Sequence, residues 1–169
     1  MGTQIRPARS QDEERLKRFL AGLSLQTQIL RFFTGVSAQR SSLIKALLAM
    51  DERHDALVAT LDDEIVGHAM SYMGAHADVE IAIVVADPWQ GCGVGQRLID
   101  TLLWRAAIRG ATTVGMDVLG ENRKVLSLIR KAFPDAKMTV SSGSVEVTAM
   151  IQQAAVFAEQ GSVGSPLTL

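Results

Sequence analysis

The sequence is short of the residues on which several classes of protein depend. Its 169 residues include one cysteine, Cys92, and three histidines. No intramolecular disulfide can therefore form, and no group of Cys and His has metal-ligand spacing, so we expect no bound metal. The net charge of -1 and the pI near 6.3 lack the basic excess typical of nucleic-acid binding proteins. We accordingly expect no nucleic-acid partner.

Long apolar runs are missing as well. No stretch approaches the roughly 18 apolar residues of a membrane span, and residues 1–9 lack the apolar core of a signal peptide. Together with the lone cysteine, this indicates a cytoplasmic protein without a membrane partner. The length fits a single domain. We expect that domain to span 1–151, followed by a partly mobile tail at 152–169 that ends in Gly, Ser and Pro.

Helices and strands are predicted in a mixed α+β order. After a short first strand come three helical segments: Ser10 with Glu13 predicts a capping box for the first, Ser24 a cap for the second, and Ser37 or Ser41 a cap for the third. The predicted strands are 3–6, 56–61, 64–73, 79–85, 112–119, 137–140 and 145–151, and the later helices are 94–109 and 122–132.

A glycine-rich loop, Gln90-Gly91-Cys92-Gly93-Val94-Gly95, lies between the strand at 79–85 and the helix that follows. Glycines at alternate positions let the backbone turn tightly and bring bare amides to an anion, and the helix N-terminus behind them favours a pyrophosphate. The loop lacks the Lys-Ser/Thr end of a nucleoside triphosphate loop, and its spacing differs from the Rossmann pattern. It follows Q/R-x-x-G-x-G/A instead, which predicts a diphosphate cofactor; the alternative is a purely structural turn.

Residues 79–85 followed by 89–95 resemble motif A of the GNAT acetyltransferases, and the similarity in element order covers 3–151. Within that superfamily, Leu23-Ser24 with Arg31-Phe32-Phe33, residues 53–59 and Glu80-Ile81-Ala82 are most similar to the catalytic domain of bacterial protein lysine acetyltransferases. The resemblance implies a GNAT fold: a mixed six- or seven-stranded sheet with helices on both faces and a splayed cofactor-binding strand. It also implies acetyl-CoA as the cosubstrate.

The same resemblance implies the residues that hold acetyl-CoA. The strand residues Ile83, Val84 and Val85 would offer backbone groups to the pantetheine arm, as a strand does to another strand. Asn122 would contact the cofactor at the start of the next helix, although an asparagine there is also a normal N-cap. The loop expected to wrap the pyrophosphate consists of Gly91, Cys92, Gly93, Val94, Gly95 and Gln96.

Glu80 is the predicted catalytic residue. A lysine-like amine with a pKa of about 10.4 is almost fully protonated at neutral pH, so attack on a thioester needs a general base. Glu80 precedes the predicted pantetheine positions on the same strand, and the resembling lysine acetyltransferases carry their glutamate at the matching place. The alternative is an ordinary exposed strand glutamate. For the developing oxyanion we expect a backbone N–H at or near Val85.

The side chain that usually protonates the departing thiolate is missing. Many GNAT enzymes carry a tyrosine seven residues after the asparagine, but position 129 is Ile129 and the only tyrosine is Tyr72. A water molecule or the proton released by the amine could serve instead. Cys92 as an acyl-carrying nucleophile is a weaker hypothesis, because no histidine is near it in sequence.

The sequence thus predicts an N-acetyltransferase that moves acetyl from acetyl-CoA to an amine by direct attack in a ternary complex. A protein lysine is the predicted acceptor, on the strength of the family resemblance. A small-molecule amine is the nearer alternative, and a non-catalytic acyl-CoA sensing module is the more distant one. Either a monomer or a homodimer is compatible with the sequence.

Overall fold

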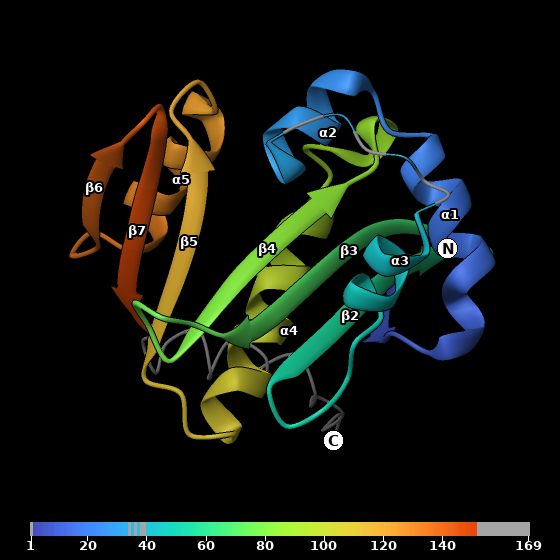
Figure 1. The fold of residues 1–169 in the computed structure, drawn as a ribbon, viewed down its shortest axis with the longest axis horizontal. Helices are drawn as coiled ribbons and strands as arrows, with labels where there is room; N and C mark the ends of the chain where they lie inside the picture. Colours follow the sequence, from blue (N-terminus) through green and yellow to red (C-terminus); the bar gives the residue numbers. More distant parts are fainter. Residues whose placement is uncertain (1, 34, 36, 38–39, 152–169) are drawn as a thin grey trace, which may run out of the picture.

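The computed structural model describes residues 2–33, 35, 37 and 40–151, so the predicted tail lies outside the described residues. Seven strands form one mixed sheet in the order β1-β2-β3-β4-β5-β7-β6 (Figure 1). Only the central pair β4–β5 is parallel. The strands are β1 (Gln4–Pro7), β2 (His54–Leu61), β3 (Glu64–Met73), β4 (Val79–Val85), β5 (Thr113–Leu119), β6 (Lys137–Ser141) and β7 (Ser144–Met150).

Helices cover both faces of the sheet, which confirms the predicted α+β architecture (Figure 1). Within the described part of the chain, no helix is both long and apolar enough to cross a membrane. The α-helices are α1 (Glu13–Ala21), α2 (Leu25–Phe32), α3 (Ser41–Leu47), α4 (Val94–Ile108) and α5 (Arg123–Ala132), and two 3-10 turns are η1 (Ser10–Asp12) and η2 (Asp87–Trp89).

The predicted helix starts are only partly correct. Ser24 caps α2, since its side chain accepts the N–H of Thr27. The capping box at Ser10 is wrong, because Ser10 begins a 3-10 turn and the buried Asp12 accepts the N–H of Arg9 at 2.9 Å instead. Asp12 also pairs with Arg6, and a carboxylate held by a guanidinium makes stronger hydrogen bonds than a serine hydroxyl.

The predicted start of the third helix is also wrong. Ser41 is the first residue inside α3 rather than its cap, and the N-cap position is occupied by Arg40, which has no capping side-chain hydrogen bond. Just before α3, the N–H of Arg40 donates to the carbonyl of Ser37. No side-chain cap therefore defines the start of α3, and the helix is stabilised by the burial of Ile44 and Leu47.

Two hydrophobic cores lie on opposite sides of the sheet. One packs α4 and α5 against the sheet, and the other packs α1, α2 and α3 against β2, β3 and β4. Strand alternation divides β4 between them, since Ile81 belongs to the first core and Val84 to the second. Gly67 on β3 allows α4 to approach closely, because a Cβ there would lie 2.9 Å from Leu98 Cδ1.

The sheet opens between β4 and β5. These strands pair only at Val79 with Val114 and at Glu80 with Gly115, and beyond that point they diverge into a V (Figure 1). The splayed strand that the family resemblance implied is therefore present. The last paired residue on β4 is Glu80, so the predicted base lies at the apex of the V.

Candidate active site

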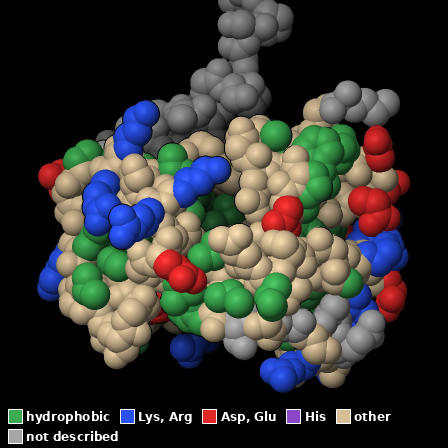
Figure 2. Space-filling view, turned by 90° about the horizontal axis from the view of Figure 1, so that it is seen from above, with side chains coloured by type: hydrophobic (Ala, Val, Ile, Leu, Met, Phe, Trp, Pro, Cys, Tyr) green, Lys and Arg blue, Asp and Glu red, His purple; other side chains and the backbone are tan. Residues whose placement is uncertain are grey.

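A cleft of about 1070 Å³ fills the V. Figure 2 looks into the open end of the V, and the cleft is visible there as the hollow near the centre of the molecule. Its walls come from α2, the second half of β4, the glycine loop with the first half of α4, Met116 of β5, and α5. Eight of the predicted cofactor residues line it: Ile83, Val84, Val85, Gly91, Gly93, Gly95, Gln96 and Asn122.

The other two predicted cofactor residues, Cys92 and Val94, do not line the cleft. Cys92 is exposed, and Val94 is only 3% exposed within the core beneath the loop. Gly91 and Gly93 have φ of +76° and +82°, in the left-handed region that only glycine adopts without strain. The loop is thus shaped by two glycines above a valine that holds it to the core.

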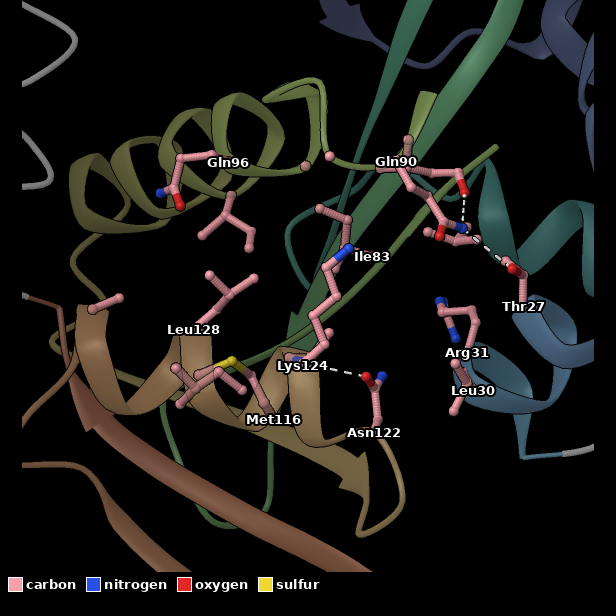
Figure 3. A pocket seen from close by; sticks show the side chains of 18 of the residues that line it. Thr27, Leu30, Arg31, Ile83, Gln90, Gln96, Met116, Asn122, Lys124 and Leu128 are labelled. Atoms are coloured by element: carbon pink, nitrogen blue, oxygen red, sulfur yellow. Dashed lines mark hydrogen bonds between the residues drawn. The ribbon is translucent and has the colours of Figure 1, made fainter. Parts of the chain in front are cut away.

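Helix α2 is tied to the end of β4 by a hydrogen-bond network that sequence reasoning missed. Asp87 accepts the hydroxyls of Ser24 and Thr27, each at 2.7 Å, and the N–H of Ser24 at 3.0 Å. Burial opposes ionisation of Asp87, but these hydrogen bonds outweigh it and lower its pKa. Gln90 Nε2 donates to Thr27 Oγ1 at 3.2 Å and to the carbonyl of Val85 at 3.1 Å (Figure 3).

The opposite wall begins at Asn122. Its Oδ1 accepts the N–H of Val125 at 3.3 Å, so the N-cap interpretation is confirmed. Arg123 and Lys124 follow and also line the cleft, and Lys124 extends into it (Figure 3). Figure 2 shows lysine and arginine side chains beside the hollow on the α5 side. The sequence analysis did not single out this basic pair, although its place directly after the asparagine is a feature of the sequence that could have indicated a basic wall.

Glu80 is held at the apex by two hydrogen bonds. Its Oε2 accepts the phenol of Tyr72 at 3.0 Å, and its Oε1 accepts the N–H of Ala75 at 3.2 Å. Burial, together with the hydrogen bond to Glu80, raises the pKa of Tyr72 to about 12. Tyr72 therefore stays protonated and remains a donor throughout the neutral range.

Two glycines make room for this glutamate. A Cβ on Gly74 would lie 2.6 Å from Glu80 Cγ and 2.9 Å from the carbonyl of Ala77. A Cβ on Gly115, the strand partner of Glu80, would lie 3.1 Å from the same Cγ. A larger residue at either position would therefore displace the side chain of Glu80 from the place that its hydrogen bonds fix.

Glu80 does not line the large cleft but a small hollow beside it, and Met116 lines both spaces. Asp117 and Glu146 line the hollow too. Although Asp117 is exposed overall, partial desolvation at the sheet surface, followed by the nearby carboxylates of Glu80 and Glu146, raises its pKa. The hollow thus gathers three carboxylates beside the end of the V.

Position 129 belongs to the large cleft as well. Ile129 is 7% exposed and packs in the core on α5, so no phenol can act from that place. Among the described residues, no group of three or more His, Cys, Asp or Glu side chains, the three carboxylates of the hollow included, is arranged so that it could hold a metal ion.

The Acetyltransferase (GNAT) family model matches residues 24–133. Among solved structures, the fold is similar to the GNAT domain of S. lividans PAT, with a TM-score of 0.79 and 23% identity over 88% of this chain and 90% of that one. It is similar to a phosphinothricin acetyltransferase from Sinorhizobium meliloti in complex with AcCoA, with a TM-score of 0.68 and 14% identity over 90% of each chain. It is also similar to the PaiA N-acetyltransferase from Thermoplasma acidophilum in complex with coenzyme A, with a TM-score of 0.67 and 15% identity over 89% of this chain and 99% of that one.

Proposed function

The chain belongs to the GNAT acetyltransferase family and is an acetyl-CoA dependent N-acetyltransferase, and we propose that its acceptor is a lysine side chain of a protein. The single observation that carries the proposal is the position of Glu80, fixed at the apex of the V on a part of the sheet that leads to an open surface. The other features below support the assignment of roles.

The cleft fits acetyl-CoA in its shape and in its polar groups. Beyond Glu80 the backbone of β4 has no partner on β5, so its N–H and C=O groups can pair with the amides of a pantetheine arm. Gly91 and Gly93 bring the loop backbone to the N-terminus of α4, where an anion is favoured. Lys124 supplies a cation on the opposite wall. Acetyl-CoA, when bound, supplies the thioester whose acetyl group is transferred.

Glu80 acts as the general base in this proposal. Its carboxylate oxygens accept from Tyr72 and Ala75, and each oxygen keeps a lone pair for the proton of an incoming ammonium group. Tyr72 keeps the carboxylate oriented and, with its raised pKa, does not compete for that proton. The proton passes from the acceptor nitrogen to Glu80, which leaves the amine free to attack.

The open half of the sheet supports a protein acceptor. On the face where Glu80 lies, no described helix packs over β7 or β6, and the side chains there are polar, including Asp117, Glu146 and Thr139. An open surface accommodates a macromolecule, whereas a small amine is usually enclosed. The carboxylates of Asp117 and Glu146 would attract the positively charged lysine. A small-molecule amine remains the alternative acceptor.

Acetyl transfer to a lysine-bearing protein and to small amines tests the proposal. The wild-type chain is expected to acetylate exposed protein lysines with a higher kcat/KM than free lysine or a polyamine. Higher kcat/KM for a small amine would contradict the protein acceptor, and acetyl-CoA binding without transfer to any acceptor would favour the sensing module, for which the missing acid at Ile129 is the supporting feature.

The single cysteine supports a reducing compartment, so we place the reaction in the cytoplasm. Described residues of one chain line the cleft, so a monomer is compatible with acetyl-CoA binding. A homodimer is equally compatible with this site.

A further inference from the structure

Arg31 on α2 is a partly buried cation without an anionic partner. Its Nε is buried and has no hydrogen-bond partner among the described residues, and its Nη2 contacts only the sulfur of Met70, at 3.5 Å. The guanidinium carbon also lies 4.5 Å from the centre of the Phe32 ring. Burial lowers the pKa of Arg31 to about 10, so the group is still charged at neutral pH. An unpaired desolvated cation destabilises the fold.

Two other arginines withdrawn from solvent show what this fold normally does with such a group. Arg6 makes a fork onto Asp12 with both bonds at 2.8 Å, and Arg105 makes a fork onto Asp55 at 2.6 and 3.0 Å. Both aspartates are nearly fully buried, at 1% and 2% exposed. Arg31 is the exception, and unlike the other two it lines the cleft and points toward it (Figure 3).

Neighbouring titratable groups do not neutralise Arg31 either. Tyr72 and His68 lie within its electrostatic range. Burial raises the pKa of Tyr72 to about 12 and lowers that of His68 to about 4, so both are uncharged at neutral pH. The positive charge of Arg31 is therefore available to attract an anionic group of a molecule bound in the cleft.

Arg31 lies at the reactive end of the cleft and not at its phosphate end. The Met70 that it contacts pairs with Ala82, two residues after Glu80 on β4. Tyr72, on the same strand, donates to Glu80 itself. The glycine loop begins only after Val85 and η2, at the other end of the strand. The phosphates of coenzyme A thus have their own amides and cations, and they do not account for Arg31.

We propose that Arg31 forms a carboxylate-binding subsite at the reactive end of the cleft, so that one of the two substrates carries a carboxylate close to the reacting atoms. This rests on the proposed acyl transfer. A planar guanidinium fork matches a carboxylate in charge and geometry. The carboxylate has two possible sources: the far end of a dicarboxylic acyl chain on coenzyme A, or an acidic group beside the acceptor lysine.

The test compares two matched pairs of substrates. The donor pair is succinyl-CoA and butyryl-CoA, which have four-carbon acyl chains with and without a carboxylate, and acetyl-CoA serves as the reference. The acceptor pair is a lysine peptide with glutamate beside the lysine and the same peptide with glutamine there. Both kcat/KM and calorimetric affinity are measured for wild type, for Arg31→Met and Arg31→Lys, and for Arg18→Gln, a control on the exposed surface of α1, where Arg18 pairs with Glu64.

Wild type is expected to prefer the carboxylate member of one pair by at least about tenfold, the worth of a charge-assisted hydrogen bond. A preference within the donor pair would identify the acyl chain as the source of the carboxylate, and a preference within the acceptor pair would identify the acidic neighbour of the lysine. Arg31→Met should abolish the preference, Arg31→Lys should keep part of it, and Arg18→Gln should keep all of it. The melting temperature of ligand-free Arg31→Met should equal or exceed that of wild type, because a desolvated charge is replaced by an apolar side chain of similar length.

Equal wild-type affinity and kcat/KM within both pairs would overturn the subsite. So would an Arg31→Met variant that is slower with every substrate by the same factor, since that result would assign Arg31 to the transition state or to the fold. If no acyl transfer occurs at all, the proposed function fails, while the affinities still decide whether Arg31 binds a carboxylate.

Discussion

The two halves of the sheet are built differently. Strands β1 to β4 have helices on both faces, α1 to α3 on one and α4 on the other (Figure 1). Strands β5, β7 and β6 have α5 on one face, and among the described helices α2 contacts β5 from across the V. The first half therefore leaves few of its side chains exposed, whereas the second half leaves a polar surface open beside the apex of the V. Strands β1 to β4 thus contribute most of the buried residues of the sheet, while strands β5, β7 and β6 leave the surface beside Glu80 accessible to a second substrate.

The halves meet at only two residue pairs, Val79 with Val114 and Glu80 with Gly115. The covered half holds Glu80 through Tyr72, while the open half contributes Gly115 beneath it and Asp117 nearby. The predicted chemistry thus depends on residues of both halves at their junction. Variants that act on one half or on the junction separate stability from catalysis.

The largest effect is expected at the junction, for Glu80→Gln. Glutamine keeps the size of the side chain but not its basicity, so the acetyl transfer rate at neutral pH should fall by about 10²-fold or more, with cofactor affinity unchanged. Raising the pH should partly rescue the variant, because more of the acceptor amine is then unprotonated. A pH-rate profile with parallel cofactor titration measures both. Glu64→Gln on the exposed part of β3 is the control, and equal rates for all three proteins would remove Glu80 from the mechanism.

A second comparison uses two glycines of the same conformation in different halves. Gly93 in the cofactor loop has φ of +82° and Gly143 in the β6–β7 turn has φ of +85°, and a Cβ on either would meet no atom within 4 Å. Valine at either position should cost stability of about 1–2 kcal/mol from left-handed backbone strain. Only Gly93→Val should also weaken acetyl-CoA binding, by at least about tenfold. Calorimetry on both folded variants decides, and equal affinities would contradict a cofactor role for the loop.

A smaller effect is expected when Glu80 is displaced rather than replaced. Gly74→Ala would bring a Cβ within 2.6 Å of Glu80 Cγ, so the carboxylate must shift. The rate should fall by about tenfold, a moderate case of the loss that misplaced catalytic groups cause, and the affinity for acetyl-CoA should not change. Gly22→Ala at the end of α1, where a Cβ would lie 3.5 Å from the nearest atom, controls for adding a methyl group and should keep the wild-type rate.

The smallest effect is expected for Asn122→Ala on the open half. Loss of the N-cap of α5 should lower the free energy of unfolding by about 1 kcal/mol. If Asn122 also contacts the cofactor, the thermal stabilisation by acetyl-CoA should shrink as well. Thermal shift with and without the ligand separates the two roles. Lower stability with an undiminished ligand shift would leave Asn122 as a cap alone.

Local patterns were enough to predict most elements. The strand at 79–85 and the helix beginning at Val94 agree with prediction because their apolar periodicity and the flanking glycines are contained in the segment itself. The starts of α1 and α3 could not be predicted, since a distant pairing and tertiary packing decided them. For Asp12 the deciding partner is Arg6, which alone gives no sequence signal.

The backbone elements that form the site could be predicted from the sequence, but the contacts of its side chains could not. The glycine loop and Glu80 lie in one continuous motif. Tyr72 reaches Glu80 only because the β3–β4 hairpin sets their register, and Arg31 is unusual only for lacking a partner that other arginines have. Neither a register nor a missing contact can be recognised from one sequence.

The network around Asp87 makes the two substrate sites a linked system. One carboxylate holds the N-terminus of α2, the helix that carries Arg31, and Gln90 joins that helix to the last residue of β4. Any shift of the cofactor loop on binding therefore reaches the wall that an acceptor would contact. By reciprocity, any factor by which acetyl-CoA changes the affinity for the acceptor through this network is also the factor by which the acceptor changes the affinity for acetyl-CoA. Replacing Asp87 would therefore alter both affinities together or neither.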